Sequence, residues 1–161
     1  VVDAEDENLV YGYGRSIWAL IDTDSRQPQN IMDIRDGEIL NYIETDKACP
    51  IGALSRVRMS KDAGLVASVP THYSDVDVNG HINSVKYIEH VLDLFALDTY
   101  REYRIKRFDI AYVAESYYGD TLNYYREDVS DDVFCVRITR VPPESSEETE
   151  VCRCKIEFVK D

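Results

Sequence analysis

A histidine and several polar side chains lie close together in the stretch SDVDVNGHIN, residues 74–83. Asp77, Asn79 and His81 occupy every second position, and a patterned helix is expected to follow. An imidazole with carboxylate and carboxamide neighbours suits carbonyl chemistry, because a carboxylate can orient the imidazole or activate water. Backbone N–H groups at the helix start, near Gly80 and His81, would favour the oxyanion that develops on attack. The short D-x-N-x-H pattern is weakly specific by itself.

The same stretch has the opening spacing of an EF-hand calcium loop, D-x-D-x-N-G, which runs from Asp75 to Gly80. Position 12 of such a loop carries a bidentate glutamate, and in this chain that position is Lys86. The preceding segment, SVPTHYS, holds Pro70 and β-favouring residues where an entering helix is required. We therefore predict that the stretch is not a calcium site, and we expect no metal.

A purely structural interpretation is that these residues form a turn and a helix cap, with Asn79 or Asn83 accepting the free N–H groups. Capping needs only one such residue. It does not require Asp77, Asn79 and His81 to point together from an extended approach to the helix. The sequence favours a catalytic site and does not exclude a role of these residues in capping the helix.

One long helix is expected over residues 83–100, with about three to four turns. The apolar side chains that should form its buried face are Val85, Ile88, Leu92, Phe95 and Ala96. The other face carries Lys86, Glu89, His90 and Asp93. His90 is therefore predicted to be solvated.

Strand patterns dominate the rest of the chain. They cover residues 11–22, 65–74, 107–116, 119–128, 133–140 and 149–159. Residues 32–48 indicate a charged connector with a short helix. A lone helix against a curled antiparallel sheet is an α+β arrangement, and a helix wrapped by such a sheet is the hotdog fold. We expect a complete hotdog domain at residues 61–161, preceded at residues 1–60 by a linker and part of another unit.

Composition excludes several classes of protein. The chain has 161 residues, 44% of them apolar, and a formal net charge of −13. Such acidity argues against a general nucleic-acid binder, which needs a basic face. No apolar run approaches the roughly 18 residues of a membrane helix, and the acidic start VVDAEDEN is unlike a signal peptide.

The four cysteines show no zinc-binding spacing. Cys152 and Cys154 lie two apart on an expected strand and should face the same way as Ile156 and Phe158. All four cysteines, including Cys49 and Cys135, are expected to be buried free thiols. Free thiols fit a reducing, cytoplasm-like compartment.

The segment SDVDVNGHINSVKYIEHVLD resembles the signature SDxDxNxHxNNxKYxxW of the fatty acyl-ACP thioesterases of plants and bacteria, where it follows the linker between two hotdog repeats. The matching residues are Ser74, Asp75, Asp77, Asn79, His81, Asn83, Lys86 and Tyr87. RFDIAYVAESYYGDTL resembles the family's strand ending Y-x-x-E-C-x-x-x-D. Glu115 occupies the position of the catalytic glutamate, and Asp120 that of the later aspartate. GRSIWALIDTDSRQPQNI, with Trp18, resembles the last strand of the first repeat.

Two departures from the family pattern matter. Ser116 stands where many plant members have a cysteine that was once proposed as nucleophile. A serine there favours water activated by carboxylate and histidine. The chain also begins partway through the first repeat, so we expect part of the acyl pocket to lie outside it.

The resemblance implies hydrolysis of the thioester between a fatty acyl chain and acyl carrier protein, without metal or cofactor. Asp77, Asn79, His81 and Glu115 would form the site. Glu115, with Asn79, would position and deprotonate water, while His81 polarises the carbonyl or protonates the leaving thiol. Asp77 would orient the asparagine and histidine.

Acyl carrier protein is itself acidic, so docking asks for a local basic patch. The densest basic run consists of Arg101, Arg104, Lys106 and Arg107. A second run consists of Arg56, Arg58 and Lys61. Both runs are also consistent with solvated strand ends.

Other functions stay open at the level of sequence. The same scaffold serves acyl-CoA thioesterases and dehydratases, and a non-catalytic acyl-binding module is the alternative from another class. Hotdog units usually pair, so a homodimer is a further expectation. The location expected is the bacterial cytoplasm, or the plastid stroma of a plant.

Overall fold

The computed structural model describes residues 1–43, 48, 50–54 and 56–160. The chain divides into two compact units, Val1–Leu54 and Ser55–Asp161, here called unit 1 and unit 2 and described separately. No helix in the described part of the chain is long and apolar enough to cross a membrane.

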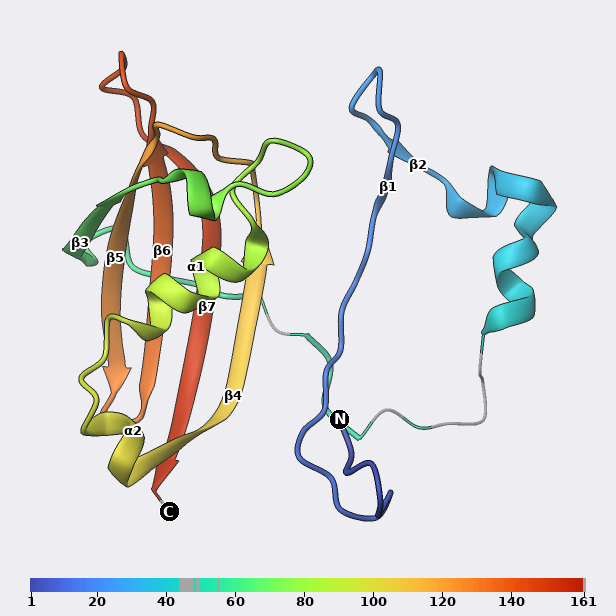
Figure 1. Cartoon of the computed structure of the whole chain (residues 1–161), viewed down its shortest axis with the longest axis horizontal. Coiled ribbons are helices and arrows are strands. Elements are labelled where there is room, and N and C mark those ends of the chain that lie inside the picture. The colour runs from blue at the N-terminus through green and yellow to red at the C-terminus, as the bar shows by residue number, and fades with distance from the viewer. Residues whose placement is uncertain (44–47, 49, 55, 161) are drawn as a thin grey trace. The chain divides into compact units, whose positions relative to one another are not determined.

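Unit 2 is a five-stranded antiparallel sheet with the strand order β3-β5-β6-β7-β4. Its strands are β3 (Gly64–Pro70), β4 (Tyr103–Tyr112), β5 (Thr121–Ser130), β6 (Val133–Val141) and β7 (Thr149–Lys160). Between β3 and β4 lie the 3₁₀ turn η2 (Tyr73–Asp75), helix α1 (Ser84–Leu92) and the short helix α2 (Thr99–Glu102). Figure 1 shows α1 lying across one face of the curved sheet. The predicted α+β hotdog arrangement is confirmed for unit 2.

The core of unit 2 lies between α1 and the sheet. Alternate residues of a strand face the same side, so β5, β6 and β7 each turn a row of apolar side chains toward the helix. The strand members of this core include Leu122, Tyr124, Val136, Ile138, Cys152, Cys154, Ile156 and Phe158. Tyr87 and Val91 join them from α1. The predicted orientation of the β7 cysteines is therefore confirmed.

The cysteines that the structure describes are buried free thiols, as expected: Cys135, Cys152 and Cys154. Cys49 lies outside the described residues.

Helix α1 differs from the prediction in length and in its buried face. It has nine residues and ends at Leu92, after which i→i+3 bonds from Leu94 and Phe95 form turns. The buried residues are Tyr87 and Val91, whereas Val85 is 51% exposed. The predicted stripe is wrong at Val85, because the large ring of Tyr87 supplies more apolar area to the buried face. Phe95, which lies beyond the end of the helix, packs against the core as predicted.

His90 belongs to the face that α1 turns toward the sheet. It is half-buried, and its ring packs edge-on against Tyr124 with 6.1 Å between ring centroids. The prediction of a solvated His90 is therefore wrong, for the same reason as the predicted stripe.

Unit 1 contains little regular structure. The expected strand over residues 11–22 is reduced to β1 (Leu20–Ile21), which pairs with β2 (Pro28–Gln29). A longer strand needs partners for its backbone N–H and C=O groups, and β1 pairs only over these two residues within the described chain. The expected short helix is present as the kinked 3₁₀ segment η1 (Ile31–Tyr42).

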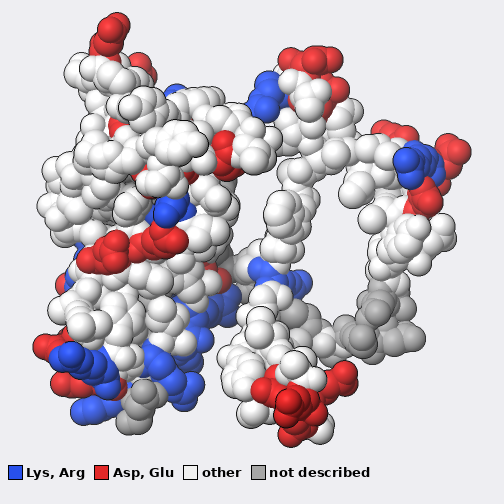
Figure 2. Space-filling view, viewed as in Figure 1, with Lys and Arg blue, Asp and Glu red and all other residues white. Residues whose placement is uncertain are grey.

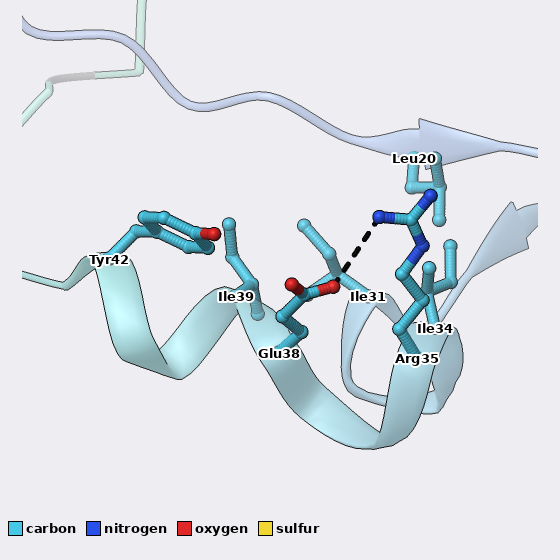
Figure 3. A pocket seen from close by; sticks show the side chains of 7 residues that line it. All are labelled: Leu20, Ile31, Ile34, Arg35, Glu38, Ile39 and Tyr42. Carbon is cyan, nitrogen blue, oxygen red and sulfur yellow. Dashed lines mark hydrogen bonds and ion pairs between the residues drawn. The ribbon is translucent and has the colours of Figure 1, made fainter.

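Apolar side chains of η1 point toward β1 and line an open pocket of about 360 Å³ (Figure 3). The lining residues are Leu20, Ile31, Ile34, Arg35, Glu38, Ile39 and Tyr42. An ion pair of 3.4 Å joins Arg35 to Glu38 at its edge. That unit 1 is part of a preceding hotdog unit stays a prediction.

Candidate active site

The loop that carries the histidine is a tight hairpin. Val76 and Ile82 form an isolated antiparallel bridge. Within it, the N–H of Asp77 donates to the carbonyl of His81 at 2.8 Å, and the N–H of Gly80 donates back to the carbonyl of Asp77 at 3.1 Å. Gly80 has a φ of +81°, a backbone conformation that glycine adopts at little cost. The predicted extended approach is therefore wrong, because the chain reverses direction between positions 77 and 81.

Asp77 shapes this hairpin through its side chain. Its Oδ1 accepts the N–H of Asn79 at 2.8 Å and the N–H of His81 at 3.2 Å, an arrangement that short acidic side chains favour in turns. Asp77 thus holds His81 through the main chain. Asn79 is exposed at the tip of the turn.

The predicted oxyanion donors, the N–H groups of Gly80 and His81, already take part in hydrogen bonds of the hairpin. The N–H of Gly80 donates to the Asp77 carbonyl, and the N–H of His81 donates to the Asp77 carboxylate. Both groups are engaged within the turn. They do not form a pair of donors directed at a substrate oxygen.

Asn83 caps α1, as one of the two predicted candidates. Its Oδ1 accepts the N–H of Val85 at 3.0 Å, and its own N–H donates to the carbonyl of Asp75 at 2.7 Å. The buried carboxylate of Asp75 accepts the N–H of His72 at 2.7 Å. The two aspartates of the calcium-like pattern therefore hold backbone N–H groups of the chain itself.

Glu115 lies in the loop between β4 and β5, shortly after β4 ends at Tyr112. The prediction placed it on the strand, so its position is corrected by a few residues. Its Oε2 lies 3.4 Å from Nε2 of His81, with the two side chains 38% and 28% exposed. The structure thus brings together the imidazole and the carboxylate at a surface that water and a substrate can reach.

A main-chain hydrogen bond joins the two loops beside this pair. The N–H of Ile82 donates to the carbonyl of Ser116 at 2.9 Å. Because residues 82 and 116 directly follow His81 and Glu115, the bond sets the spacing of the two functional side chains.

Ser116 points away from this surface. Its side chain is buried, and its hydroxyl lies 2.5 Å from the hydroxyl of Tyr87. Burial raises the pKa of Tyr87 above its usual value. Ser116 is therefore a core residue and is not presented to a substrate as a nucleophile.

Asp120 anchors the β4–β5 loop. It is buried, it pairs with Nη1 of Arg140 at 3.2 Å, and its Oδ2 accepts the N–H of Tyr117 at 2.9 Å. Tyr117 in turn donates its hydroxyl to Oε2 of Glu115 at 3.2 Å. Local pattern does not distinguish Tyr117 from the other tyrosines among the 12 in the chain, and Arg140 lies outside the basic runs.

Acid–base chemistry on a carbonyl is what this arrangement offers. An imidazole and a carboxylate in contact can remove a proton from water and return one to a leaving group. Within the described residues, no three His, Cys, Asp or Glu side chains gather in a way that suits a metal ion.

The basic run after α1 is largely paired with acidic side chains. Arg101 contacts Asp98 at 2.7 Å, and Lys106 lies 3.5 Å from Glu157. Arg107 makes two hydrogen bonds to the buried Asp109, 2.7 and 2.8 Å long, and hydrogen bonding to Asp109 raises the pKa of Arg107. Figure 2 shows blue side chains gathered at the lower end of unit 2, with some red ones among them. The positive charge of this run is therefore partly offset by acidic neighbours.

Comparisons with known proteins show which family this chain resembles. Residues 59–161 match the model of the acyl-ACP thioesterase C-terminal domain. A structure of an acyl-ACP thioesterase from Bacteroides thetaiotaomicron is 42% identical, with a TM-score of 0.74 over 86% of this chain and 53% of that one. A search of curated proteins found no match.

More distant structures share the fold. The 12:0-ACP thioesterase from Umbellularia californica is 20% identical, with a TM-score of 0.68 over 88% of this chain and 53% of that one. A hexameric hotdog fold thioesterase of Campylobacter jejuni is 15% identical, with a TM-score of 0.52 over 63% of this chain and 86% of that one. The chain spans about half the length of the two acyl-ACP thioesterases it resembles.

Proposed function

The chain belongs to the acyl-ACP thioesterase family, and we propose that the protein hydrolyses fatty acyl-ACP to a free fatty acid and holo-ACP. The observation that supports this most is the 3.4 Å contact between Nε2 of His81 and Oε2 of Glu115. The contact joins two loops that are far apart in sequence, and both residues belong to the motifs that resemble the family.

In the first step, Glu115 accepts a proton from a water molecule, and the water oxygen attacks the thioester carbonyl carbon. Water is expected to reach the pair because both side chains are partly exposed. Asn79, exposed at the tip of the hairpin, is proposed to help Glu115 position this water. Negative charge develops on the carbonyl oxygen during the attack.

In the second step, the tetrahedral intermediate collapses and the C–S bond breaks. His81 donates a proton to the departing thiolate and so yields the thiol of the phosphopantetheine arm. The proton that Glu115 took from water is then returned to His81 across their 3.4 Å contact. The sum is one thioester and one water giving one carboxylic acid and one thiol. Asp77 takes part only by holding the hairpin.

Several finer features belong to the same proposal. The substrate is delivered on acyl carrier protein, as part of fatty acid biosynthesis, in a bacterial cytoplasm or a plastid stroma. Unit 2 is expected to pair with another hotdog unit, either in a longer chain or in a homodimer. No cofactor takes part in the steps above.

The proposal is tested with the full-length protein and acyl-ACP and acyl-CoA of several chain lengths. His81→Ala and Glu115→Gln should each lower kcat by about 10²- to 10⁴-fold, the usual contribution of acid–base groups. His72→Gln is the matched control, because His72 is an exposed histidine outside the contact. Circular dichroism should show all three variants folded.

The alternatives are outcomes of the same assay. Hydrolysis of acyl-CoA alone would identify a CoA thioesterase, and water loss from a hydroxyacyl substrate would identify a dehydratase. Binding of acyl chains without turnover would identify a non-catalytic module. Near-normal turnover of either variant would refute the assigned roles.

A further inference from the structure

We infer that Tyr117 is a positioning residue that orients the Glu115 carboxylate toward His81; this inference rests on the proposed function. The Tyr117 hydroxyl donates to Oε2 of Glu115 at 3.2 Å. The same oxygen lies 3.4 Å from Nε2 of His81. Two contacts that converge on one oxygen restrict the rotation of the carboxylate about its terminal bond.

The ring of Tyr117 also contacts the other member of the pair. The Tyr117 and His81 rings meet edge to face, with centroids 5.3 Å apart and an interplanar angle of 81°. Such an arrangement is favoured between aromatic rings. Tyr117 therefore touches both the imidazole and the carboxylate, and it fixes their relative position from one side.

Arg140 holds the ring of Tyr117 in place. Its guanidinium carbon lies 5.1 Å from the ring centroid, within the range of a cation–π interaction. Arg140 is itself fixed by its 3.2 Å ion pair with the buried Asp120. The tyrosine ring thus rests on a side chain that is anchored in the protein.

The backbone of Tyr117 is held by the same group of residues. Its N–H donates to Oδ2 of Asp120 at 2.9 Å, and its carbonyl accepts the hydroxyl of the buried Thr71 at 3.0 Å. Thr71 also accepts the N–H of Gly119 at 2.8 Å. Contacts to the backbone and to the ring therefore restrict Tyr117, although the residue is 40% exposed.

Glu115 needs such a partner, because a partly exposed glutamate has three rotatable side-chain bonds and loses considerable entropy when held in one rotamer. A general base acts efficiently only when it is held close to its productive geometry. Tyr117 has only two rotatable bonds before its hydroxyl, and its ring contacts both His81 and Arg140. It can therefore hold the carboxylate at little additional cost.

The test compares Tyr117→Phe with Tyr118→Phe in the full-length protein. Phenylalanine keeps the ring contacts to His81 and Arg140 and removes only the hydroxyl, while Tyr118 is 68% exposed and serves as the control. We expect kcat for acyl-ACP hydrolysis to fall about 10-fold in Tyr117→Phe with KM and melting temperature unchanged. Tyr118→Phe should behave as wild type. An unchanged or raised kcat in Tyr117→Phe would overturn the inference.

A double-mutant cycle separates positioning from a general structural effect. If Tyr117 acts through Glu115, the Tyr117→Phe change should have no further effect on kcat in a Glu115→Gln background. Equal losses of kcat in both backgrounds would show that the hydroxyl acts elsewhere.

Crystal structures of wild type and Tyr117→Phe give a readout that does not depend on turnover. We expect one Glu115 rotamer in the wild type and several in the variant. A single rotamer in the variant, still in contact with His81, would refute the inference whatever the activity. Absence of thioester hydrolysis in the wild type would instead refute the proposed function, and the rotamers would still decide the role of Tyr117.

Discussion

The side-chain hydroxyls of Tyr87 and Ser116 lie 2.5 Å apart in the interior of unit 2. Tyr87 comes from α1, and Ser116 directly follows Glu115 in the β4–β5 loop. Because Ser116 is drawn into the core, Glu115 faces the surface next to His81. Ser116 therefore supports the fold beneath the site.

Ser116→Ala should lower stability and spare activity. The change leaves the buried Tyr87 hydroxyl without its partner, which costs about 1–3 kcal/mol of unfolding free energy. Urea titration measures this loss, and kcat with acyl-ACP should stay within about twofold of wild type. Adding Tyr87→Phe removes both polar groups and should recover part of the lost stability. Complete loss of turnover in a folded Ser116→Ala protein would instead indicate a nucleophile.

Tyr124→Phe should raise stability. Tyr124 is fully buried, and its hydroxyl has no hydrogen-bond partner among the described residues. Burial raises the pKa of this phenol far above its usual value, so the group stays neutral. Removing an unpaired buried hydroxyl should increase the unfolding free energy by about 1 kcal/mol, measured by urea titration. Tyr87→Phe, which removes a bonded hydroxyl, is the matched control and should lower stability.

Gly80→Ala should weaken the hairpin that carries His81. The φ of +81° at Gly80 is unfavourable for a side chain, although no atom lies within 4 Å of the Cβ position. The cost is therefore backbone strain alone, about 1–2 kcal/mol, and kcat should fall as His81 moves. Gly64→Ala is the control, since Gly64 also has open space and no positive φ. Equal melting temperatures and rates for the two variants would contradict this reasoning.

The described cysteines should resist alkylation in the native protein. Burial raises the pKa of Cys135, and a hydrogen bond with Cys154 together with burial raises that of Cys152. The reactive thiolate is therefore scarce at neutral pH and becomes accessible only on unfolding. Mass spectrometry of peptides after iodoacetamide treatment should show Cys135 and Cys152 modified only in denaturant. Alkylation of either cysteine in the folded protein at pH 7 would contradict their burial.

Charge reversal of Arg104 and Lys106 tests docking of acyl carrier protein. Both side chains are exposed on the edge strand β4, and replacing them does not break the buried Arg107–Asp109 pair. If they attract the acidic carrier, KM for acyl-ACP should rise about tenfold at low salt and less at high salt. Reversal of Arg56, Arg58 and Lys61 provides the comparison. If neither set of charge reversals changes KM for acyl-ACP, neither basic run takes part in docking.

Much of unit 2 follows from the sequence, because its strands alternate apolar and polar residues and its strand ends carry turn residues. The pattern of β7, with Cys152, Cys154, Ile156 and Phe158, placed four core residues correctly. The family resemblance predicts that His81 and Glu115 belong to one site. Local pattern alone would not have paired residues from two loops so far apart.

The errors have physical causes. The buried face of α1 depends on Tyr87, whose hydroxyl finds its partner in a distant loop. The hairpin at His81 depends on the Asp77 carboxylate and on Gly80, and a period-two pattern of polar residues does not distinguish such a turn from a strand. Strand formation over residues 11–22 requires neighbouring strands, which a local pattern does not report.

The hydrogen bond from the N–H of Ile82 to the carbonyl of Ser116 involves main-chain atoms alone. Its geometry does not depend on which side chains stand at positions 81 and 115. The backbone that sets the spacing is therefore independent of the side chains of His81 and Glu115. Over evolutionary time, such a framework permits the histidine and the glutamate to be exchanged for other residues while the loops stay in place. A library randomised at these two positions would sample new chemistries at a constant separation.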